Sequence, residues 1–177
     1  HVVDRRIVAD AHGGRPLPQW AGLKFFNVYG PREDHKGEMR SVVNKIWPRV
    51  ACGDPVQLFR SHRQDYEDGG QSRDFVYVDD CVAVMEWLLD NPDQSGIFNV
   101  GSGKARSFLD LALAAFAAAG RAPDIAFIDM PEDLRGQYQY FTEADMTKLR
   151  SRGYRRPSTP LEDGVRAYVE TWLTQRP

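Results

Sequence analysis

Five ionisable side chains follow an apolar segment of this 177-residue chain, at a point where a strand is expected to end. Residues 22–29 are mostly aromatic, aliphatic or β-branched, and Gly30 and Pro31 end the segment abruptly. The five side chains that follow are Arg32, Glu33, Asp34, His35 and Lys36. In open α/β sheets, ligands bind at the carboxyl ends of the strands, so this cluster is predicted to lie at an active site.

Lys36 is the residue of this cluster that could carry out acid–base chemistry. A lysine in a cleft loses its proton more easily when it is desolvated or lies near another cation, and it can then act as a general acid or base. The alternative is an ordinary exposed lysine, which is the usual situation of this side chain. The residue type alone leaves both interpretations open.

A second charged segment, RDFVYVDD at residues 73–80, surrounds an expected short strand at 75–78. Arg73 precedes this strand, and a guanidinium group there can hold a phosphate with two hydrogen bonds. Asp79 is predicted to cap the following helix, and Asp80 to interact favourably with its dipole. Arg73 is therefore either a phosphate ligand or a structural cation.

Other motifs fail on their spacing. The GSGK segment at 101–104 is not a phosphate-binding loop, because Phe98 and Ala105 occupy the positions that require Gly and Ser or Thr. Arg106 stands where a dinucleotide fingerprint needs its last glycine, so a tight turn is the predicted role. No Gly-x-Ser-x-Gly motif occurs, and the histidines lack metal-ligand spacing, so no metal is predicted.

Composition restricts the class of protein. With 42% hydrophobic residues, the chain can form one domain or parts of two, and a net charge of −2 argues against a dedicated nucleic-acid binder. Its longest apolar helical stretch, 108–119, is shorter than the ~20 residues of a membrane span, and no signal peptide is visible. The chain is predicted to be soluble and cytoplasmic, with Cys52 and Cys81 as buried free thiols.

Alternating strands and helices around these residues predict an α/β fold. Ser107 and Asp110 form an expected capping box, and Val82, Met85 and Leu89 share one face of their helix. The polar segment 60–72 is predicted to be a solvated loop, with a flap over a ligand as the alternative. The expected strands are 22–29, 56–59, 75–78, 96–100 and 124–130. The expected helices are 1–11, 39–51, 79–90, 108–119, 143–152 and 161–172.

Three segments in this order, FFNVYGPRE, RDFVYVDD and GIFNVGSG, resemble the extended short-chain dehydrogenase/reductase superfamily of nucleotide-sugar epimerases and dehydratases. HKGEM and LRGQYQYFTEADMTKLRSRGY are most similar to the epimerases in it that act on an ADP-heptose, and the likeness covers essentially all of the chain. It implies the carboxyl-terminal part of a Rossmann-type parallel sheet domain plus a small α/β substrate domain. Residues 1–37 and 73–107 are assigned to the Rossmann domain, and 38–72 and 108–177 mainly to the substrate domain.

The resemblance also implies a reaction: NADP oxidises the sugar at C6 and returns the hydride to the other face of the ketone. The expected partners are an ADP-sugar substrate and further copies of the chain in a homo-oligomer. The family's first base is the Tyr of a Tyr-x-x-x-Lys motif, which no tyrosine here begins, so the motif is expected upstream and this chain alone is expected to be inactive. Another nucleotide-sugar epimerase or dehydratase, or a catalytically silent binding fragment, are the alternatives.

Site residues follow by position from the same resemblance. Lys36 matches a second acid–base lysine that also lies at the cofactor. The other matches are Val28 for a backbone contact to NADP, Asn27 for the sugar, Phe59 for the adenine-side loop, and Arg73 and Tyr138 for the diphosphate. Five more candidates depart from the family's pattern: Glu38 and Lys45 near the sugar, and Arg60, Ser61 and His62 in a nucleotide-side loop that is longer than usual.

Overall fold

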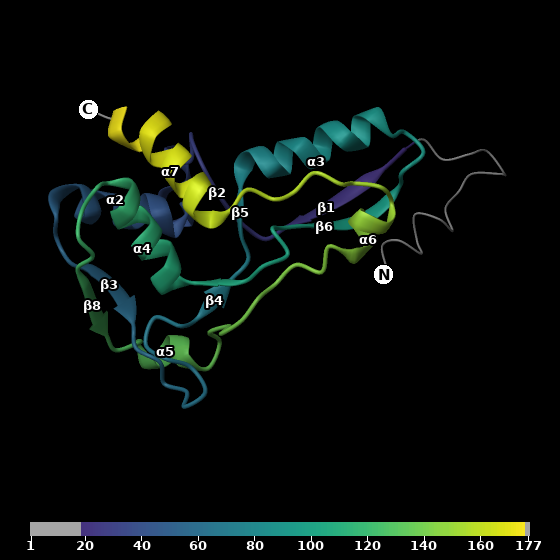
Figure 1. Cartoon of the computed structure of the whole chain (residues 1–177). Helices are drawn as coiled ribbons and strands as arrows, with labels where there is room; N and C mark the ends of the chain where they lie inside the picture. The colour runs from purple at the N-terminus through teal and green to yellow at the C-terminus, as the bar shows by residue number, and fades with distance from the viewer. Residues whose placement is uncertain (1–18, 176–177) are drawn as a thin grey trace.

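The computed structural model describes residues 19–175 and has an α/β fold built largely on parallel strand pairs (Figure 1). The predicted helix 1–11 lies outside the described residues. Three pairs are parallel: β1 (Ala21–Phe25) with β6 (Gly96–Val100), β2 (Asn27–Tyr29) with β5 (Phe75–Tyr77), and β3 (Val56–Phe59) with β8 (Ile125–Ile128). One pair is antiparallel: β4 (Ser72–Arg73) with β7 (Arg106–Ser107).

Helices connect and cover these strand pairs. Their bounds are η2 (Asp34–Met39), α2 (Val42–Cys52), α3 (Val78–Asp90), α4 (Phe108–Ala118), α5 (Glu132–Arg135), α6 (Thr147–Ser151), α7 (Leu161–Thr171) and η3 (Leu173–Gln175). The capping box is confirmed: Ser107 Oγ accepts from Asp110 N at 2.9 Å, and Ser107 N donates to Asp110 Oδ2 at 3.0 Å. No helix within residues 19–175 is long and apolar enough to cross a bilayer.

Two hydrophobic cores hold the molecule together. The larger core lies among α2, α4 and α7, around Val43, Leu111 and Tyr168. The smaller core lies between α3, β6 and α6, around Val84, Phe98 and Leu149. Figure 1 shows the two groups of elements side by side, with β2 and β5 between them. The assignment of residue ranges to a cofactor domain and a substrate domain stays a prediction.

The predicted strand 22–29 is two strands, because the chain changes its partner at Phe26. Phe26 N still donates to Val100 O of β6 at 3.0 Å, whereas Asn27 N donates to Asp74 O at 3.0 Å, just before β5. β1 has β6 as its partner, and no other described strand pairs with it. Leu23, Phe26 and Val28 of this apolar segment therefore pack against the smaller core, and Tyr29 at its end belongs to the larger one.

The face of α3 that Val82, Met85 and Leu89 share is turned to solvent. Val82, Met85 and Leu89 are exposed, whereas Cys81, Val84 and Leu88 are buried against the smaller core. The side chain of Asp79 does not cap the helix, because α3 already begins at Val78 with Tyr77 at its N-cap. Apolar residues spaced three or four apart identified the helix. Which of its faces is buried is decided only by its packing against β6.

Two predicted elements are shorter than expected. The helix expected at 143–152 begins only at Thr147, because the residues before it bond elsewhere: Glu143 Oε2 accepts from Ala105 N at 2.8 Å. The strand expected at 124–130 is limited to β8, where pairing with β3 ends.

The two cysteines differ. Cys81 is buried, and this burial raises the pKa of its thiol to about 12. The predicted burial of Cys52 is wrong, because it is the last residue of α2 and faces solvent.

Candidate functional site

A cavity of about 350 Å³ lies beside β2, the strand at whose carboxyl end the sequence predicted a ligand site. Asn27 and Val28 line it from the strand, and residues 39–43 line it from the start of α2. The chain turns away directly after the strand, at Gly30. A Cβ there would lie 2.4 Å from a side-chain carbon of Val78, so only glycine fits this turn. Two of the predicted contact residues are thus brought into one cavity.

The turn η2, which carries Lys36, is anchored by the buried carboxylate of Glu33. Glu33 Oε2 accepts from Ser41 N at 2.7 Å, and its Oε1 accepts from Ser41 Oγ and from the Tyr168 hydroxyl. No cationic side chain pairs with Glu33 within residues 19–175, so hydrogen bonds alone compensate its burial. Burial is the main cause that raises the pKa of Tyr168, which therefore acts as a hydrogen-bond donor here.

Lys36 itself is exposed and lines neither of the cavities described here. Its backbone N donates to Glu33 O at 3.0 Å, and its side chain makes no ion pair with a described residue. It lies three residues before Met39, which does line the cavity at β2. Nearby, Glu38 and Lys45 form an ion pair at 3.5 Å whose partners are both exposed. Such exposed pairs contribute little to stability.

A second cavity, of about 310 Å³, adjoins the first, because Val42 lines both. Its walls are mostly apolar and aromatic, and they include the predicted residues Phe59 and Tyr138. The rings of these two residues meet edge to face, with their centroids 6.1 Å apart. No carboxylate is among the described residues that line either cavity. An apolar slot with few polar groups is typical of a small-molecule site.

Arg73 lies beside this second cavity as a half-buried cation without an acidic partner among residues 19–175. Its guanidinium lies over the rings of Phe108 and Tyr138, at 5.6 and 5.3 Å from their centroids. Its single hydrogen bond within the described part of the chain goes from Nη1 to Ser72 O, at 2.9 Å. Burial lowers the pKa of Arg73, and the neighbouring Tyr138 opposes this shift. A guanidinium nevertheless stays protonated, so most of its donors remain available to an anion.

Residues 60–67 are mostly exposed, as expected of a solvated loop, but hydrogen bonds hold the segment 60–72 in place. Ser61 N donates to Asp68 Oδ1 at 2.8 Å, and His62 N donates to the Tyr140 hydroxyl at 3.0 Å. The His62 ring also lies in hydrogen-bond contact with that hydroxyl, Nδ1 to Oη at 2.8 Å. Arg60 forms exposed ion pairs with Asp68 and with a carboxylate after β8. The five candidates that depart from the family's pattern, Glu38, Lys45, Arg60, Ser61 and His62, line neither of the two cavities.

Tyr140 and Asp74 are structural residues of the site that the sequence did not single out. The buried Asp74 accepts hydrogen bonds from Ser102 N, Gly103 N and Ala144 N at 2.7 to 2.9 Å, and so joins three segments of the chain. Tyr140 was present in the quoted motif GQYQYF. Tyr138 and Tyr140 are two positions apart in that motif but make different contacts. Tyr138 lines the second cavity, whereas the Tyr140 hydroxyl accepts from His62 N.

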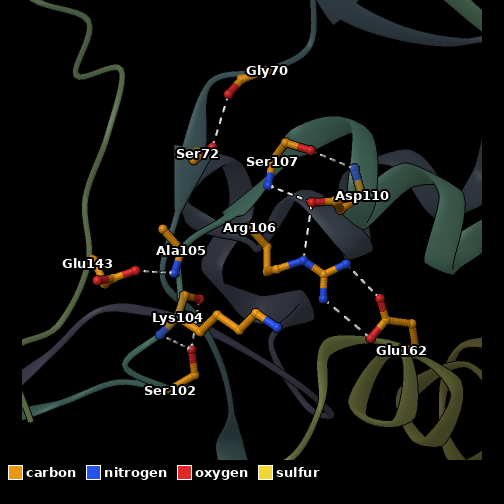
Figure 2. A network of polar contacts seen from close by, with 10 residues as sticks. All are labelled: Gly70, Ser72, Ser102, Lys104, Ala105, Arg106, Ser107, Asp110, Glu143 and Glu162. Atoms are coloured by element: carbon orange, nitrogen blue, oxygen red, sulfur yellow. Dashed lines mark hydrogen bonds and ion pairs between the residues drawn. The ribbon is translucent and has the colours of Figure 1, made fainter.

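The turn after β6 is held by polar contacts within the protein, as Figure 2 shows. Arg106 contacts Asp110 at 3.1 Å and Glu162 at 2.7 Å, so it connects the start of α4 with the start of α7. The hydrogen bond from Arg106 lowers the pKa of Glu162. Burial alone would raise the pKa of Asp110, but hydrogen bonds from Arg106 and Ser107 outweigh it and lower this pKa as well. This region is consistent with the predicted tight turn.

Two curated relatives cover most of the chain. It is 58% identical over 153 residues to the ADP-L-glycero-D-manno-heptose-6-epimerase of Nitratidesulfovibrio vulgaris, covering 86% of this chain and 47% of that protein. It is 48% identical over 163 residues to the protein of the same name from Fusobacterium nucleatum, covering 89% and 49%. The chain thus spans about half the length of the curated relatives it matches.

Solved structures agree with the fold. The ADP-L-glycero-D-manno-heptose-6-epimerase of Helicobacter pylori is 26% identical with a TM-score of 0.73, over 94% of this chain and 47% of that chain. The UDP-glucose 4-epimerase of Thermus thermophilus, in complex with NAD, is 30% identical with a TM-score of 0.71, over 97% and 52%. Residues 11–101, more than half of the sequence, match the sequence model of the NAD dependent epimerase/dehydratase family. The chain belongs to the NAD dependent epimerase/dehydratase family.

Proposed function

We propose that this chain is part of a cytoplasmic enzyme that converts ADP-D-glycero-D-manno-heptose to ADP-L-glycero-D-manno-heptose by inversion at C6, with bound NADP. The names of the curated relatives support the substrate. The structural observation that carries the proposal is Arg73, a half-buried cation between two aromatic rings and without a carboxylate among the described residues. An arginine in this situation is suited to bind the diphosphate of a sugar nucleotide.

The two adjoining cavities suggest how such a substrate lies. The aromatic slot of Phe59 and Tyr138 suits the adenine ring, with the diphosphate at Arg73. The sugar then reaches past Val42 into the cavity at the end of β2, where Asn27 offers an amide for its hydroxyl groups. Because Val42 lines both cavities, one extended ligand can occupy them together.

The cavity at β2 also fits the nicotinamide end of the cofactor. Val28 and other apolar residues form its wall, and such linings are usual for cofactor rings. A nicotinamide held there would supply reversible hydride transfer at C6 of the sugar, which is the chemistry that inversion at this carbon requires. Val28 is assigned a backbone contact to this cofactor, which we take to be NADP. The chain itself supplies orientation and an apolar wall that limits the access of water.

Lys36 is assigned the proton transfer at the C6 oxygen on one face of the sugar, and a contact to the cofactor. Its support is its position on a turn that Glu33 anchors, three residues before Met39 of the cavity wall. An acid–base group of this kind contributes roughly 10²- to 10⁴-fold to a rate.

A second candidate function is the epimerisation of a UDP-hexose at C4. The observation that favours it is the similarity to the UDP-glucose 4-epimerase of Thermus thermophilus, which is 30% identical and has a TM-score of 0.71. The higher identity of 58% to an ADP-heptose epimerase ranks it second.

The test uses the full-length gene product with each sugar nucleotide. ADP-D-glycero-D-manno-heptose is incubated with the protein and NADP, and the ratio of the two C6 epimers is followed by proton NMR. We expect conversion to the L-glycero epimer and no turnover of UDP-glucose. Turnover of UDP-glucose without any conversion of the ADP-heptose would replace the first proposal by the second.

A further inference from the structure

A buried glutamine, Gln71, lines the aromatic slot without being part of any expected site. Its side chain is 1% exposed, and it lies between the loop that ends at Gly70 and strand β4. Its backbone O accepts from Phe108 N at 3.0 Å, which fixes the main chain at this position. A polar side chain buried beside an apolar cavity normally needs hydrogen-bond partners, so its amide group requires an explanation.

The contacts of Gln71 determine which amide atom remains available. Its Nε2 lies near two backbone oxygens, Phe59 O at 3.5 Å and Arg60 O at 3.4 Å. Two acceptors on one side require the NH₂ group to point there, because an amide oxygen would be repelled. Within residues 19–175, no donor reaches Oε1. The unused polar atom of Gln71 is therefore a hydrogen-bond acceptor at the wall of the slot.

An acceptor in an apolar aromatic slot favours a planar ligand that carries a donor. Phe59, Phe108 and Tyr138 line the slot and provide aromatic surface for such a ring. Oε1 is not among the fully buried atoms that lack a partner, so it is accessible to a ligand in the slot, and a donor on that ligand would give it a hydrogen bond. Glutamine amides pair with the amino group of adenine in the same way in other recognition sites.

We propose that Gln71 Oε1 accepts a hydrogen bond from the exocyclic amino group of adenine and so selects a 6-amino purine over a 6-keto purine. This rests on the proposed function in one respect, that the slot binds the base of the nucleotide. It deepens that function, because it names the residue that reads the base. A 6-keto purine would place a second acceptor against Oε1, and the two oxygens would repel each other.

The experiment compares ADP with inosine diphosphate, which differs in having a keto group at position 6. Binding to the full-length gene product is measured by isothermal titration calorimetry, so no turnover is needed. We expect ADP to bind roughly tenfold more tightly than inosine diphosphate, the effect of one buried hydrogen bond. Purine riboside diphosphate, which has neither group at this position, is expected to lie between the two.

Two variants assign the preference to one residue. Gln71→Met keeps the volume of the side chain and removes the acceptor, so we expect ADP to bind more weakly and inosine diphosphate, which no longer meets a second oxygen, to bind more tightly. Gln64→Met is the control, because Gln64 is exposed in the same loop and lines neither cavity. It should retain the tenfold preference, which is roughly the effect of one hydrogen bond. Thermal unfolding of both variants shows whether they are folded.

The outcomes separate this inference from the proposed function. Equal binding of ADP and inosine diphosphate to the unchanged protein would overturn the role of Gln71, and this comparison needs no variant to fold. A preference that persists in Gln71→Met would also overturn it. Tight, selective ADP binding without epimerisation would leave Gln71 as the reader of the base and remove the proposed reaction. No binding of either nucleotide would remove both.

Discussion

The Tyr168 hydroxyl donates a hydrogen bond to the Glu33 carboxylate, at 2.9 Å, although the two residues are 135 positions apart in the chain. Tyr168 belongs to α7, and Glu33 precedes the turn η2 on which Lys36 lies. The same hydroxyl accepts a hydrogen bond from Asn44 Nδ2 at 2.7 Å, and Asn44 connects α2 to this pair of residues. The last long helix of the fold thus fixes the segment that carries the proposed acid–base residue.

Tyr168→Phe should therefore destabilise the protein and loosen this turn. Loss of the hydroxyl leaves buried polar atoms without a partner, and we expect a decrease of roughly 1–3 kcal/mol in the free energy of unfolding. Urea denaturation measures this change, and hydrogen exchange of the Lys36 amide reports the turn. Tyr66→Phe is the matched control, since the Tyr66 hydroxyl makes no hydrogen bond within residues 19–175. Equal stability of the two variants would contradict the role of this contact.

Lys36→Met should slow epimerisation while cofactor binding persists. The variant removes a proton donor and acceptor, so we expect kcat to fall roughly 10²- to 10⁴-fold in the full-length protein. Cofactor binding is measured by fluorescence titration and should persist, weakened only by the loss of the proposed Lys36 contact. Lys104→Met, an exposed lysine on the turn after β6, is the control and should retain full activity (Figure 2). Unchanged turnover of the Lys36 variant would refute the assignment.

Arg73→Ala should act on substrate binding. A diphosphate contact is present in both the ground state and the transition state, so we expect KM to rise roughly tenfold to a hundredfold with a smaller change in kcat. Arg73→Lys keeps the charge but loses the guanidinium fork, and should recover part of the loss. If KM stays the same and only stability decreases, Arg73 is a structural cation that packs on Phe108 and Tyr138.

Asp74→Ala should be severely destabilising. The carboxylate accepts from three backbone N–H groups and from Ser102 Oγ, and its removal leaves these buried donors unpaired. We expect a loss of roughly 3 kcal/mol or more in the free energy of unfolding. Asp79→Ala is the control, because Asp79 is exposed in the first turn of α3. Thermal unfolding of both variants gives the comparison, and a similar small effect in both would show that Asp74 is not essential.

The ion pair of Arg106 and Glu162 should produce a small dependence of stability on pH (Figure 2). The hydrogen bond from Arg106 lowers the pKa of Glu162 in the folded state below its usual value of 4.5. Its contribution is therefore present above that value, and it is lost as the pH falls through the folded-state pKa. Because Glu162 is half-exposed, we expect the ion pair to contribute less than about 1 kcal/mol to the free energy of unfolding. The stability difference between the unchanged protein and Glu162→Gln should shrink toward zero as the pH falls below the folded-state pKa, which urea denaturation at a series of pH values measures.

Local signals in the sequence predicted much of this fold. The capping box of Ser107 and Asp110 and the bounds of β6 needed only neighbouring residues, and both are as expected. The resemblance to a known superfamily singled out Asn27, Val28, Phe59 and Tyr138 as contact residues, and in the structure the first two line one cavity and the last two another. Their roles stay predictions, whereas their grouping is a property of the structure.

The remaining features depend on contacts between distant segments. The division of the first strand at Phe26 follows from pairing with β6 on one side and β5 on the other, which no local pattern encodes. The exposed face of α3 could not be predicted, because Val82, Met85 and Leu89 have the same period as the residues that are buried. The ordered loop at His62 depends on Tyr140, which lies 78 residues away.

The single described partner of β1 has a practical consequence for handling the chain in isolation. Its second edge presents peptide N–H and C=O groups that no described strand satisfies, and Phe25 beside it is 44% exposed. Unpaired parallel edges with apolar side chains recruit strands from other molecules, and native proteins normally cover them. A preparation of these 177 residues alone should therefore self-associate with increasing concentration, and a charged substitution such as Phe25→Lys should keep it dispersed.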